Sequence, residues 1–425
     1  MVTLRKSVKF ALVMKRLYLI VISLCTLLSA RASEPTQTIE EPVETQPASR
    51  RIYPLLGVDF RPSYIFSSYR DDYLEDRLDM DNATSTHLNS AINLKAGFRF
   101  SPDSPQGRFF PGVWQGIGAG LNLFNHPEGI GTPVTLYVFQ GAPVWDITPR
   151  LSLFYEWNFG ASFGWKPSDG LMGQSNLIVG SKVNAYINLG AGLLWHIDRR
   201  WSLTAGIDLT HFSNGNTSFP NPGVNSAGLR IGVTRSFGPD YNSATVAPYI
   251  GGSDLTSQQR HKISYDLTLY GAWRKRVYRG DDHPALLRGH FPVAGLNFAP
   301  MWEVARIFRT GISADFQWDQ STDLKHHRVE GTPDDNPLFY RPPFFSQVSA
   351  GLSARAELVM PIFSVNLGIG YNFISPSESR ASYEMANLKV HLIKGLYLNV
   401  GYQLLNFSRQ NNLMLGLGYT FHGNR

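Results

Sequence analysis

The stretch WSLTAGIDLTHFS, residues 201–213, alternates between two kinds of side chain along its length. Its even positions from 202 to 210 hold Ser, Thr, Gly, Asp and Thr, whereas the odd positions from 201 to 209 hold Trp, Leu, Ala, Ile and Leu. A period of two predicts a β-strand with one apolar face and one polar face. Residues 183–197 repeat the pattern, with Trp195 on the apolar face and Asn184, Tyr186 and Asn188 on the polar face.

Composition narrows the class of protein that such strands can build. The 425 residues include 39 Gly and 26 Pro, and only 17% are charged. This frequency of helix breakers argues against helical bundles, and beyond the N-terminus no run reaches the ~20 apolar residues of a membrane-spanning helix. From Tyr53 onward the chain divides into alternating segments of about 10 residues or more, typical of a transmembrane antiparallel β-barrel.

A soluble β-sandwich also alternates and is the alternative to this fold class. Two features favour the membrane barrel. The first is a predicted export signal, and the second is the last predicted strand, residues 413–421, which ends in an aromatic residue as outer-membrane insertion signals do. The inward rows are rich in Asn, Tyr, Gly and Ser rather than in opposed charges, which favours barrels filled with side chains over an open porin.

The N-terminus predicts export to the bacterial outer membrane. Lys15 and Arg16 precede an apolar stretch, and the A-x-A motif at 30–32 is typical of a cleavage site. We expect residues 1–32 to be a signal peptide and residues 33–50 to be a disordered linker.

The predicted signal peptide also explains two features of the composition. It holds six basic and no acidic residues, so the formal net charge of +6 belongs to it, and nucleic acid is not an expected partner. The only cysteine, Cys25, lies within it. The remaining chain has no thiol for a disulfide, a nucleophile or a zinc site.

The chain contains an internal repeat with an offset near 195 residues. The segment AGFRFSP at 96 recurs as AGLNFAP at 294, and residues 196–213 match residues 391–408. We count about eight strands in each copy, enough to close a small barrel. The sequence therefore predicts two tandem barrels, residues 51–237 and 262–425, joined by a linker at 238–261. One barrel of 16 strands is the alternative.

A candidate catalytic site lies at the end of the 201–213 strand. His211 and Ser213 continue the lipid-facing row, with Cβ atoms ~7 Å apart. Antiparallel pairing with the next strand brings Asn225 near His211. A hydroxyl, an imidazole and an orienting amide would then meet at the depth of lipid ester bonds, as acyl transfer requires. Asn214, Asn221 or nearby backbone amides would donate to the oxyanion.

The segments HFSN at 211–214 and PNPGVN at 220–225 resemble the PagL-type lipid A deacylase family. The resemblance implies an eight-stranded outer-membrane barrel that removes the 3-linked acyl chain of lipid A with a His, Ser, Glu triad. It assigns the base to His211, the nucleophile to Ser213 and the oxyanion contacts to Asn214 and Asn221. Asn225 stands where the family has glutamate.

The asparagine at position 225 affects the activity that we expect of each copy of the repeat. Asn225 can orient an imidazole, but it cannot stabilise the imidazolium by charge, so the activity is expected to be low or absent. In the second copy Asn406 stands in place of His211, while Ser408 is retained. We therefore expect a serine esterase in the first copy alone and a catalytically silent second barrel.

The resemblance implies lipid A, or the lipopolysaccharide of the outer leaflet, as the partner and implies neither a metal nor an organic cofactor. A homodimer is left open. Two rival functions remain at this stage: a non-enzymatic barrel that is structural or binds lipopolysaccharide, and a diffusion porin of 16 strands.

Overall fold

The computed structural model describes most of the chain beyond residue 51. The predicted signal peptide, the linker predicted at residues 33–50 and most of the 238–261 linker lie outside the described residues. The described residues are 52–66, 87–102, 104–125, 127–167, 179–219, 223–238, 263–279, 284–305, 307–333, 337–375, 381–407 and 409–422. Among them, no helix is both long and apolar enough to cross a membrane.

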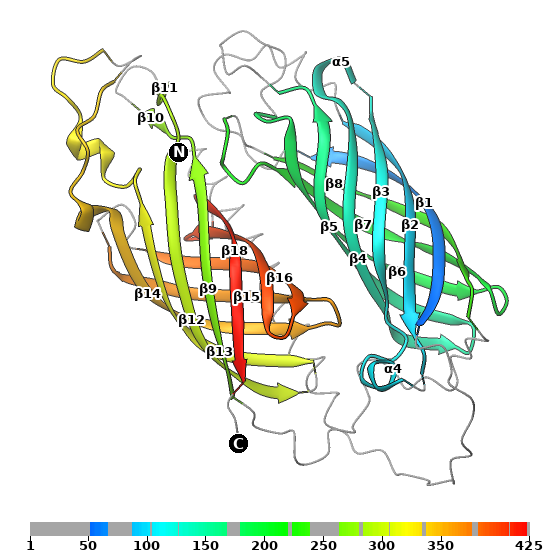
Figure 1. Ribbon diagram of the computed structural model, residues 1–425. Helices are drawn as coiled ribbons and strands as arrows, with labels where there is room; N and C mark the ends of the chain where they lie inside the picture. The colour runs from blue at the N-terminus through cyan, green and yellow to red at the C-terminus, as the bar shows by residue number, and fades with distance from the viewer. Residues whose placement is uncertain are drawn as a thin grey trace. The chain divides into compact units, whose positions relative to one another are not determined.

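Eight antiparallel strands close into a first barrel, barrel 1 (Figure 1). Each strand pairs with its neighbours in the sequence, and β1 closes the ring by pairing with β8, for example Val58 with Val233. The strands are β1 Ile52–Phe66, β2 Leu88–Phe100, β3 Trp114–Phe124, β4 Gly131–Thr148, β5 Leu151–Trp165, β6 Val183–His196, β7 Trp201–Ser213 and β8 Val224–Ser236. Two short helices interrupt the connections, α4 Pro105–Phe109 and α5 Pro127–Ile130.

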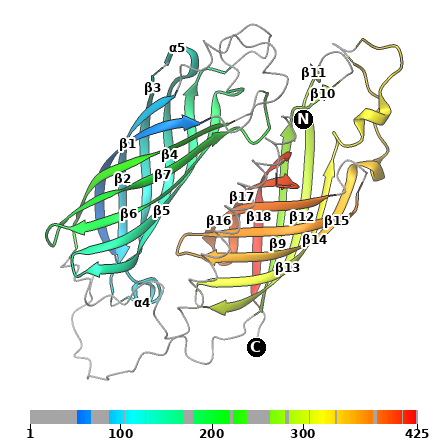
Figure 2. The ribbon, with the colours of Figure 1, turned by 180° about the vertical axis from the view of Figure 1, so that it is seen from behind.

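Eight further strands close into barrel 2, seen from both sides in Figures 1 and 2. Here β9 pairs with both β12 and β18, so this ring also closes on itself. The strands are β9 Ile263–Arg274, β12 Phe291–Ala305, β13 Phe308–Asp319, β14 Val348–Val359, β15 Phe363–Ile374, β16 Ser382–Ile393, β17 Leu396–Leu405 and β18 Arg409–His422. Loop elements are β10 Val277–Arg279, β11 Pro284–Leu286, and the 3-10 turns η2 Leu324–His327 and η3 Phe344–Gln347.

The prediction of two eight-stranded barrels is confirmed, and the single ring of 16 strands is wrong. Hydrogen bonding joins β1 to β8 and β9 to β18, so each copy of the repeat completes its own ring. Closure removes the sheet edges, which would otherwise expose unpaired backbone groups to lipid.

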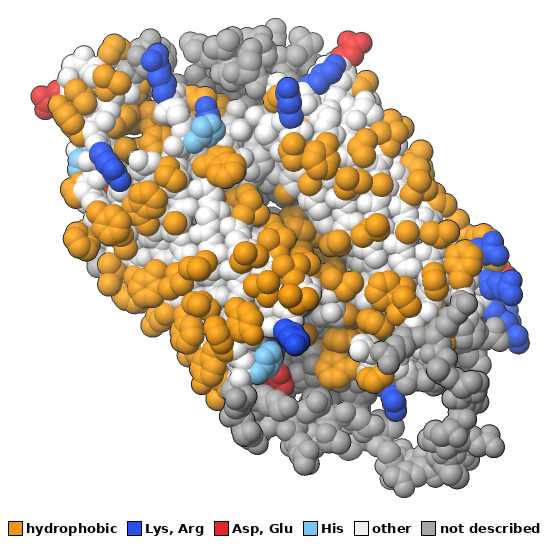
Figure 3. All heavy atoms as spheres, viewed as in Figure 1, with side chains coloured by type: hydrophobic (Ala, Val, Ile, Leu, Met, Phe, Trp, Pro, Cys, Tyr) orange, Lys and Arg blue, Asp and Glu red, His pale blue; other side chains and the backbone are white. Residues whose placement is uncertain are grey.

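The predicted alternation sets the two faces of each strand. On β6, Asn184, Tyr186 and Asn188 are buried in the lumen, whereas Val183 and Trp195 are exposed. The outer walls therefore carry mostly apolar side chains, which cover much of the visible strand surface of each barrel in Figure 3. Such a wall matches hydrocarbon, because apolar side chains lose nothing by leaving water.

The lumen of barrel 1 contains opposed charges, although its inward rows were expected to be poor in them. Glu156 accepts hydrogen bonds from Lys95 Nζ at 2.8 Å and from Arg230 Nη1 at 2.6 Å. Arg230 also donates to Asp208 Oδ1 at 2.7 Å, and Arg61 donates to Asp59 Oδ1 at 2.6 Å. Asp59 and Arg61 lie two positions apart on β1, and Asp208 and Arg230 lie on the paired strands β7 and β8. Glu156 on β5 meets Lys95 on β2 and Arg230 on β8 only because the ring closes, so the local pattern of one strand does not predict these contacts.

Barrel 2 holds a similar buried group built from different residues. Glu357 forms ion pairs with both Lys389 and Arg309, and Lys389 Nζ lies 2.5 Å from Asp266 Oδ2. Paired charges of this kind fill a lumen with hydrogen-bonded side chains and give each member of the pair a counter-ion.

Candidate functional site

The site lies at the end of barrel 1 where β7 finishes and β8 begins, which we call the long-loop end. At the opposite end, β6 and β7 are joined by a tight turn in which Asp198 Oδ1 accepts the backbone N–H groups of Arg200 and Trp201, each at 2.7 Å. These two bonds hold the pKa of the Asp198 carboxyl below its ordinary value. The turn fixes the register of β7, which then runs without a break to Ser213.

Strand alternation places His211 and Ser213 on the outer wall. Phe212, between them, is buried in the lumen with 2% of its surface exposed, whereas His211 and Ser213 are each half-buried. Both side chains continue the row that contains the exposed Ile207 and Leu209. The imidazole and the hydroxyl are therefore on the same, lipid-facing side of β7.

The register of the β7–β8 ladder makes Asn225 the direct partner of His211. Nδ1 of the imidazole lies 2.7 Å from Oδ1 of the amide. A carbonyl oxygen only accepts, so the imidazole donates through Nδ1–H and keeps a lone pair on Nε2. This tautomer is the one that a general base needs if it is to remove a proton from a hydroxyl.

Gly223 lies close to the Cε1 and Nδ1 atoms of this imidazole. Its φ of +75° is strained for any residue with a side chain, and an added Cβ would lie 3.0 Å from His211 Cε1 and 3.1 Å from the Phe212 carbonyl oxygen. The position of the ring therefore depends both on the Asn225 amide and on the absence of a side chain at Gly223.

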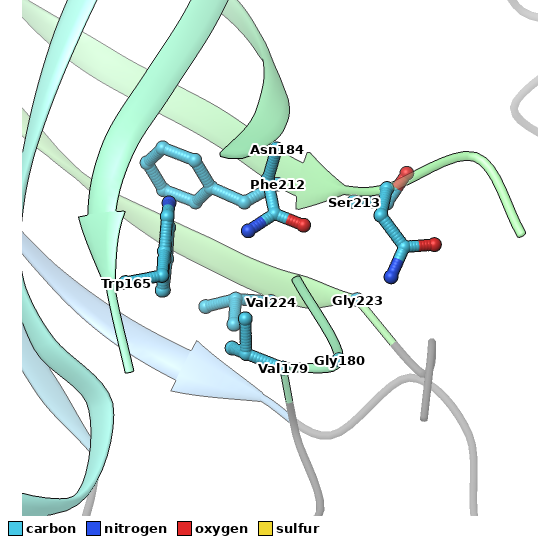
Figure 4. A pocket seen from close by; sticks show the side chains of 9 residues that line it. Trp165, Val179, Gly180, Asn184, Phe212, Ser213, Gly223 and Val224 are labelled. Atoms are coloured by element: carbon cyan, nitrogen blue, oxygen red, sulfur yellow. The ribbon is translucent and has the colours of Figure 1, made fainter. Parts of the chain in front are cut away.

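A small hollow lies next to Ser213 at the same end of the barrel (Figure 4). Figure 4 shows Asn184 beside Phe212 within it, with Ser213 at its edge. The residues that line it are Trp165, Val179, Gly180, Asn184, Phe212, Ser213, Asn214, Gly223 and Val224.

Aromatic rings inside the lumen support the strand that carries the site. The Phe212 ring meets Trp165 edge-on at 5.0 Å between centroids and packs against Tyr186 at 5.3 Å. Trp165 in turn packs against Phe124 at 5.5 Å, and its indole N–H donates to Ser162 Oγ at 2.8 Å. Because Phe212 lies between His211 and Ser213, this packing holds the backbone of both residues.

The other residues of the expected site have different surroundings. Asn214 is buried, with 7% of its surface exposed, and lines the hollow beside Ser213. Asn221 lies outside the described residues. Glu156, on β5, is a member of the buried charge group in the lumen and does not face the outer wall. The contact between Gly223 and the His211 imidazole could not be predicted from the sequence pattern, because it depends on the path of the backbone.

The second barrel has no equivalent arrangement among its described residues. Strand β17 ends at Leu405, and Asn406 and Phe407 follow in left-handed conformations with φ of 53° and 57°. Asn406 Oδ1 accepts a hydrogen bond from Ser382 Oγ at 2.9 Å. The residue matched to His211 therefore belongs to a turn and is not part of a strand wall.

The described residues contain no group of three or more His, Cys, Asp or Glu side chains placed to hold a metal ion.

Two family models match the chain, one in each barrel. Residues 155–234 match "Lipid A 3-O-deacylase (PagL)", and residues 263–423 match "Acyloxyacyl hydrolase, C-terminal domain". Together the two matches cover more than half of the chain, and the first contains His211, Ser213 and Asn225. No curated protein matches the chain.

Among solved structures, the chain is similar to the outer membrane enzyme PagL, with 16% identity over 41% of this chain and 97% of that one, at a TM-score of 0.30. It is also similar to Neisserial surface protein A, with 9% identity over 43% of this chain and 96% of that one, at a TM-score of 0.29. From its two family matches, the chain belongs to the PagL family of lipid A deacylases and is a β-barrel protein of the bacterial outer membrane.

Proposed function

We propose that barrel 1 hydrolyses an ester-linked acyl chain of lipid A, with Ser213 as nucleophile, His211 as general base and Asn225 as the residue that orients His211. The observation that carries the proposal is the 2.7 Å contact between His211 Nδ1 and Asn225 Oδ1 on the outer wall. A hydrogen-bonded imidazole with a free Nε2 lone pair has no structural purpose on a surface that faces hydrocarbon, where polar groups are costly.

The reaction would begin when Ser213 Oγ attacks the ester carbonyl carbon of a lipid in the outer leaflet. His211 Nε2 takes the hydroxyl proton as the new C–O bond forms. The tetrahedral intermediate then collapses, the bond to the sugar oxygen breaks, and the imidazolium gives its proton to that oxygen. The products of this half-reaction are the shortened lipid and an acyl ester on Ser213.

Two further groups would stabilise the charge on the intermediate. Asn214 is next to Ser213 in the chain and lines the same hollow, so its amide would donate to the oxyanion. Asn221 is the second candidate, on the strength of its place in the family motif. Asn225 carries no charge, so stabilisation of the imidazolium depends on the hydrogen bond alone.

We further propose that barrel 2 is catalytically silent. The position matched to His211 holds an asparagine in a turn, and an amide cannot act as a general base. One active site per chain is therefore expected, in the first repeat.

The test is the mass of lipid A from bacteria that express the full chain. Wild-type protein is expected to shift lipid A down by one acyl chain, and Ser213→Ala is expected to abolish the shift. The matched control is Ser408→Ala, which removes the retained serine of the second repeat and is expected to leave the shift intact. An unchanged shift in Ser213→Ala would refute the assignment. No shift in any version would favour a non-enzymatic barrel that binds lipopolysaccharide.

A further inference from the structure

The proposed hydrolysis needs water at a place that the membrane keeps dry. Once Ser213 carries an acyl chain, a water molecule must reach the ester carbonyl to release the fatty acid. Ser213 lies on the outward row of β7. Lipid would cover this wall, and the acyl chain bound to Ser213 would occupy the space in front. Water approaching through hydrocarbon would bear the full cost of leaving bulk solvent. A route from the lumen side avoids this cost.

The hollow beside Ser213 offers such a route. Its walls include the lumenal residues Trp165, Phe212 and Val224, each no more than 3% exposed, and it reaches Ser213 and Gly223 from that side. Its lining residues Trp165, Phe212 and Val224 stand at the ends of β5, β7 and β8 that meet at the long-loop end of barrel 1. The hollow therefore borders the nucleophile on the lumenal side of β7, at this end of the barrel.

One buried polar side chain equips this hollow to hold water. Asn184 is 5% exposed, and its amide is fixed by Ser181, whose hydroxyl donates to Oδ1 at 3.0 Å and whose carbonyl accepts from Nδ2 at 3.1 Å. An amide has two donor hydrogens and two acceptor lone pairs, so one bond on each atom leaves capacity for a further partner. A bound water needs two to four polar partners, which Asn184 and the backbone near Ser213 would supply.

We infer that this hollow is the binding site of the hydrolytic water and that Asn184 holds that water for attack on the acyl-enzyme. The inference rests on the proposed function of Ser213 and His211. The water oxygen bonds to the acyl carbon while His211 Nε2 takes one of its protons. The C–Oγ bond then breaks, Ser213 Oγ recovers the proton from the imidazolium, and the free fatty acid leaves.

Asn184→Leu tests the inference, because leucine branches at Cγ as asparagine does but is larger and has no polar atom. The matched control is Asn89→Leu, which makes the same change at another buried, lumen-facing position of barrel 1 that does not line the hollow. Val179→Phe is a second test variant that fills the hollow without touching Asn184. Folding of each full-length variant is checked by the heat-dependent shift of its electrophoretic mobility in detergent.

The readout separates the two halves of the reaction. Each folded variant is mixed with purified lipid A in detergent micelles, and the reaction is quenched at intervals. The mass of the protein in each sample is measured by intact-protein mass spectrometry, and the released fatty acid is measured in parallel. In Asn184→Leu and Val179→Phe we expect acylation at the wild-type rate, release slowed by about 10-fold to 100-fold, and accumulation of protein carrying one acyl chain. Asn89→Leu is expected to behave as wild type.

The outcomes distinguish failure of the inference from failure of the proposed function. Wild-type release without acyl-enzyme accumulation in both hollow variants overturns the inference and leaves the catalytic assignment intact. Loss of acylation in the folded hollow variants also overturns it, because the hollow would then serve the first half-reaction. If wild-type protein releases no fatty acid and Ser213→Ala behaves identically, the proposed function itself has failed.

Discussion

His211 and Asn225 face each other directly across the β7–β8 ladder, and the imidazole Nδ1 lies 2.7 Å from the amide Oδ1. An uncharged side chain thus occupies the position that we propose orients the imidazole, where the family that the sequence resembles has a glutamate. An amide oxygen selects the tautomer as well as a carboxylate does, but it contributes no charge to balance the imidazolium that forms in the transition state.

Asn225→Glu is therefore expected to raise turnover by about tenfold. In a serine protease, replacing the triad aspartate with asparagine lowers turnover by ~10⁴, but that larger effect includes stabilisation of the wrong histidine tautomer. Asn225→Gln is the matched control, with the length of glutamate and no charge. The measurement is the initial rate of fatty acid release from lipid A in detergent. Equal rates for the two variants would show that charge at this position has no effect on the reaction.

Gly223→Ala is expected to lower kcat by about tenfold or more while KM changes little, because a Cβ 3.0 Å from His211 Cε1 displaces the imidazole without touching the lipid. The control is Gly164→Ala. Gly164 also has a left-handed backbone, with φ of +92°, but the nearest heavy atom to its added Cβ is 3.5 Å away. Backbone strain is thus similar in both variants, and only Gly223→Ala crowds His211. Equal losses of activity would assign the effect to strain alone.

Local patterns were sufficient to predict the barrels and the surface on which the candidate residues lie. A period of two fixes the face of every side chain on a strand, so the outward positions of His211, Ser213 and Asn225 follow from counting along β7 and β8. The two rings follow from the repeat, because each copy carries enough strands to close.

Features that depend on ring closure were not predictable in the same way. The buried charge group contains Glu156 from β5, Lys95 from β2 and Arg230 from β8. The local pattern of a single strand does not predict that these side chains meet. Gly223 belongs to the segment PNPGVN, but its contact with the imidazole depends on the return path of the chain and not on the local pattern. The hollow likewise needs side chains from several strands.

Asn406→His, made in the Ser213→Ala background, is expected to give no deacylation. The substitution restores the residue types of the motif in the second repeat, a histidine two positions before Ser408, but position 406 follows the end of β17 in a left-handed turn. The backbone N–H of the next residue, Phe407, is held by Glu384 Oε2 at 2.8 Å, which stabilises that turn. Recovery of the lipid A mass shift in the double variant would show that residue types alone make the site.

Glu156→Gln is expected to destabilise barrel 1 by about 3–5 kcal/mol, because it leaves buried cations without their shared counter-charge. The Glu156 carboxylate lies 2.8 Å from Lys95 Nζ and 2.6 Å from Arg230 Nη1, and it accepts the Trp114 indole N–H at 3.0 Å. Glutamine keeps the shape of the side chain and one acceptor oxygen, so the decrease in the free energy of unfolding reports the effect of the charge.

The measurement for this variant is urea unfolding in detergent micelles, followed by tryptophan fluorescence. Glu128→Gln is the control, since Glu128 is exposed on α5 and is expected to change the free energy of unfolding by less than about 0.5 kcal/mol. The deacylation rate of folded Glu156→Gln should equal that of wild type, because Glu156 faces the lumen and the proposed site faces lipid. A wild-type free energy of unfolding combined with lost activity would reverse this assignment and give Glu156 a part in catalysis.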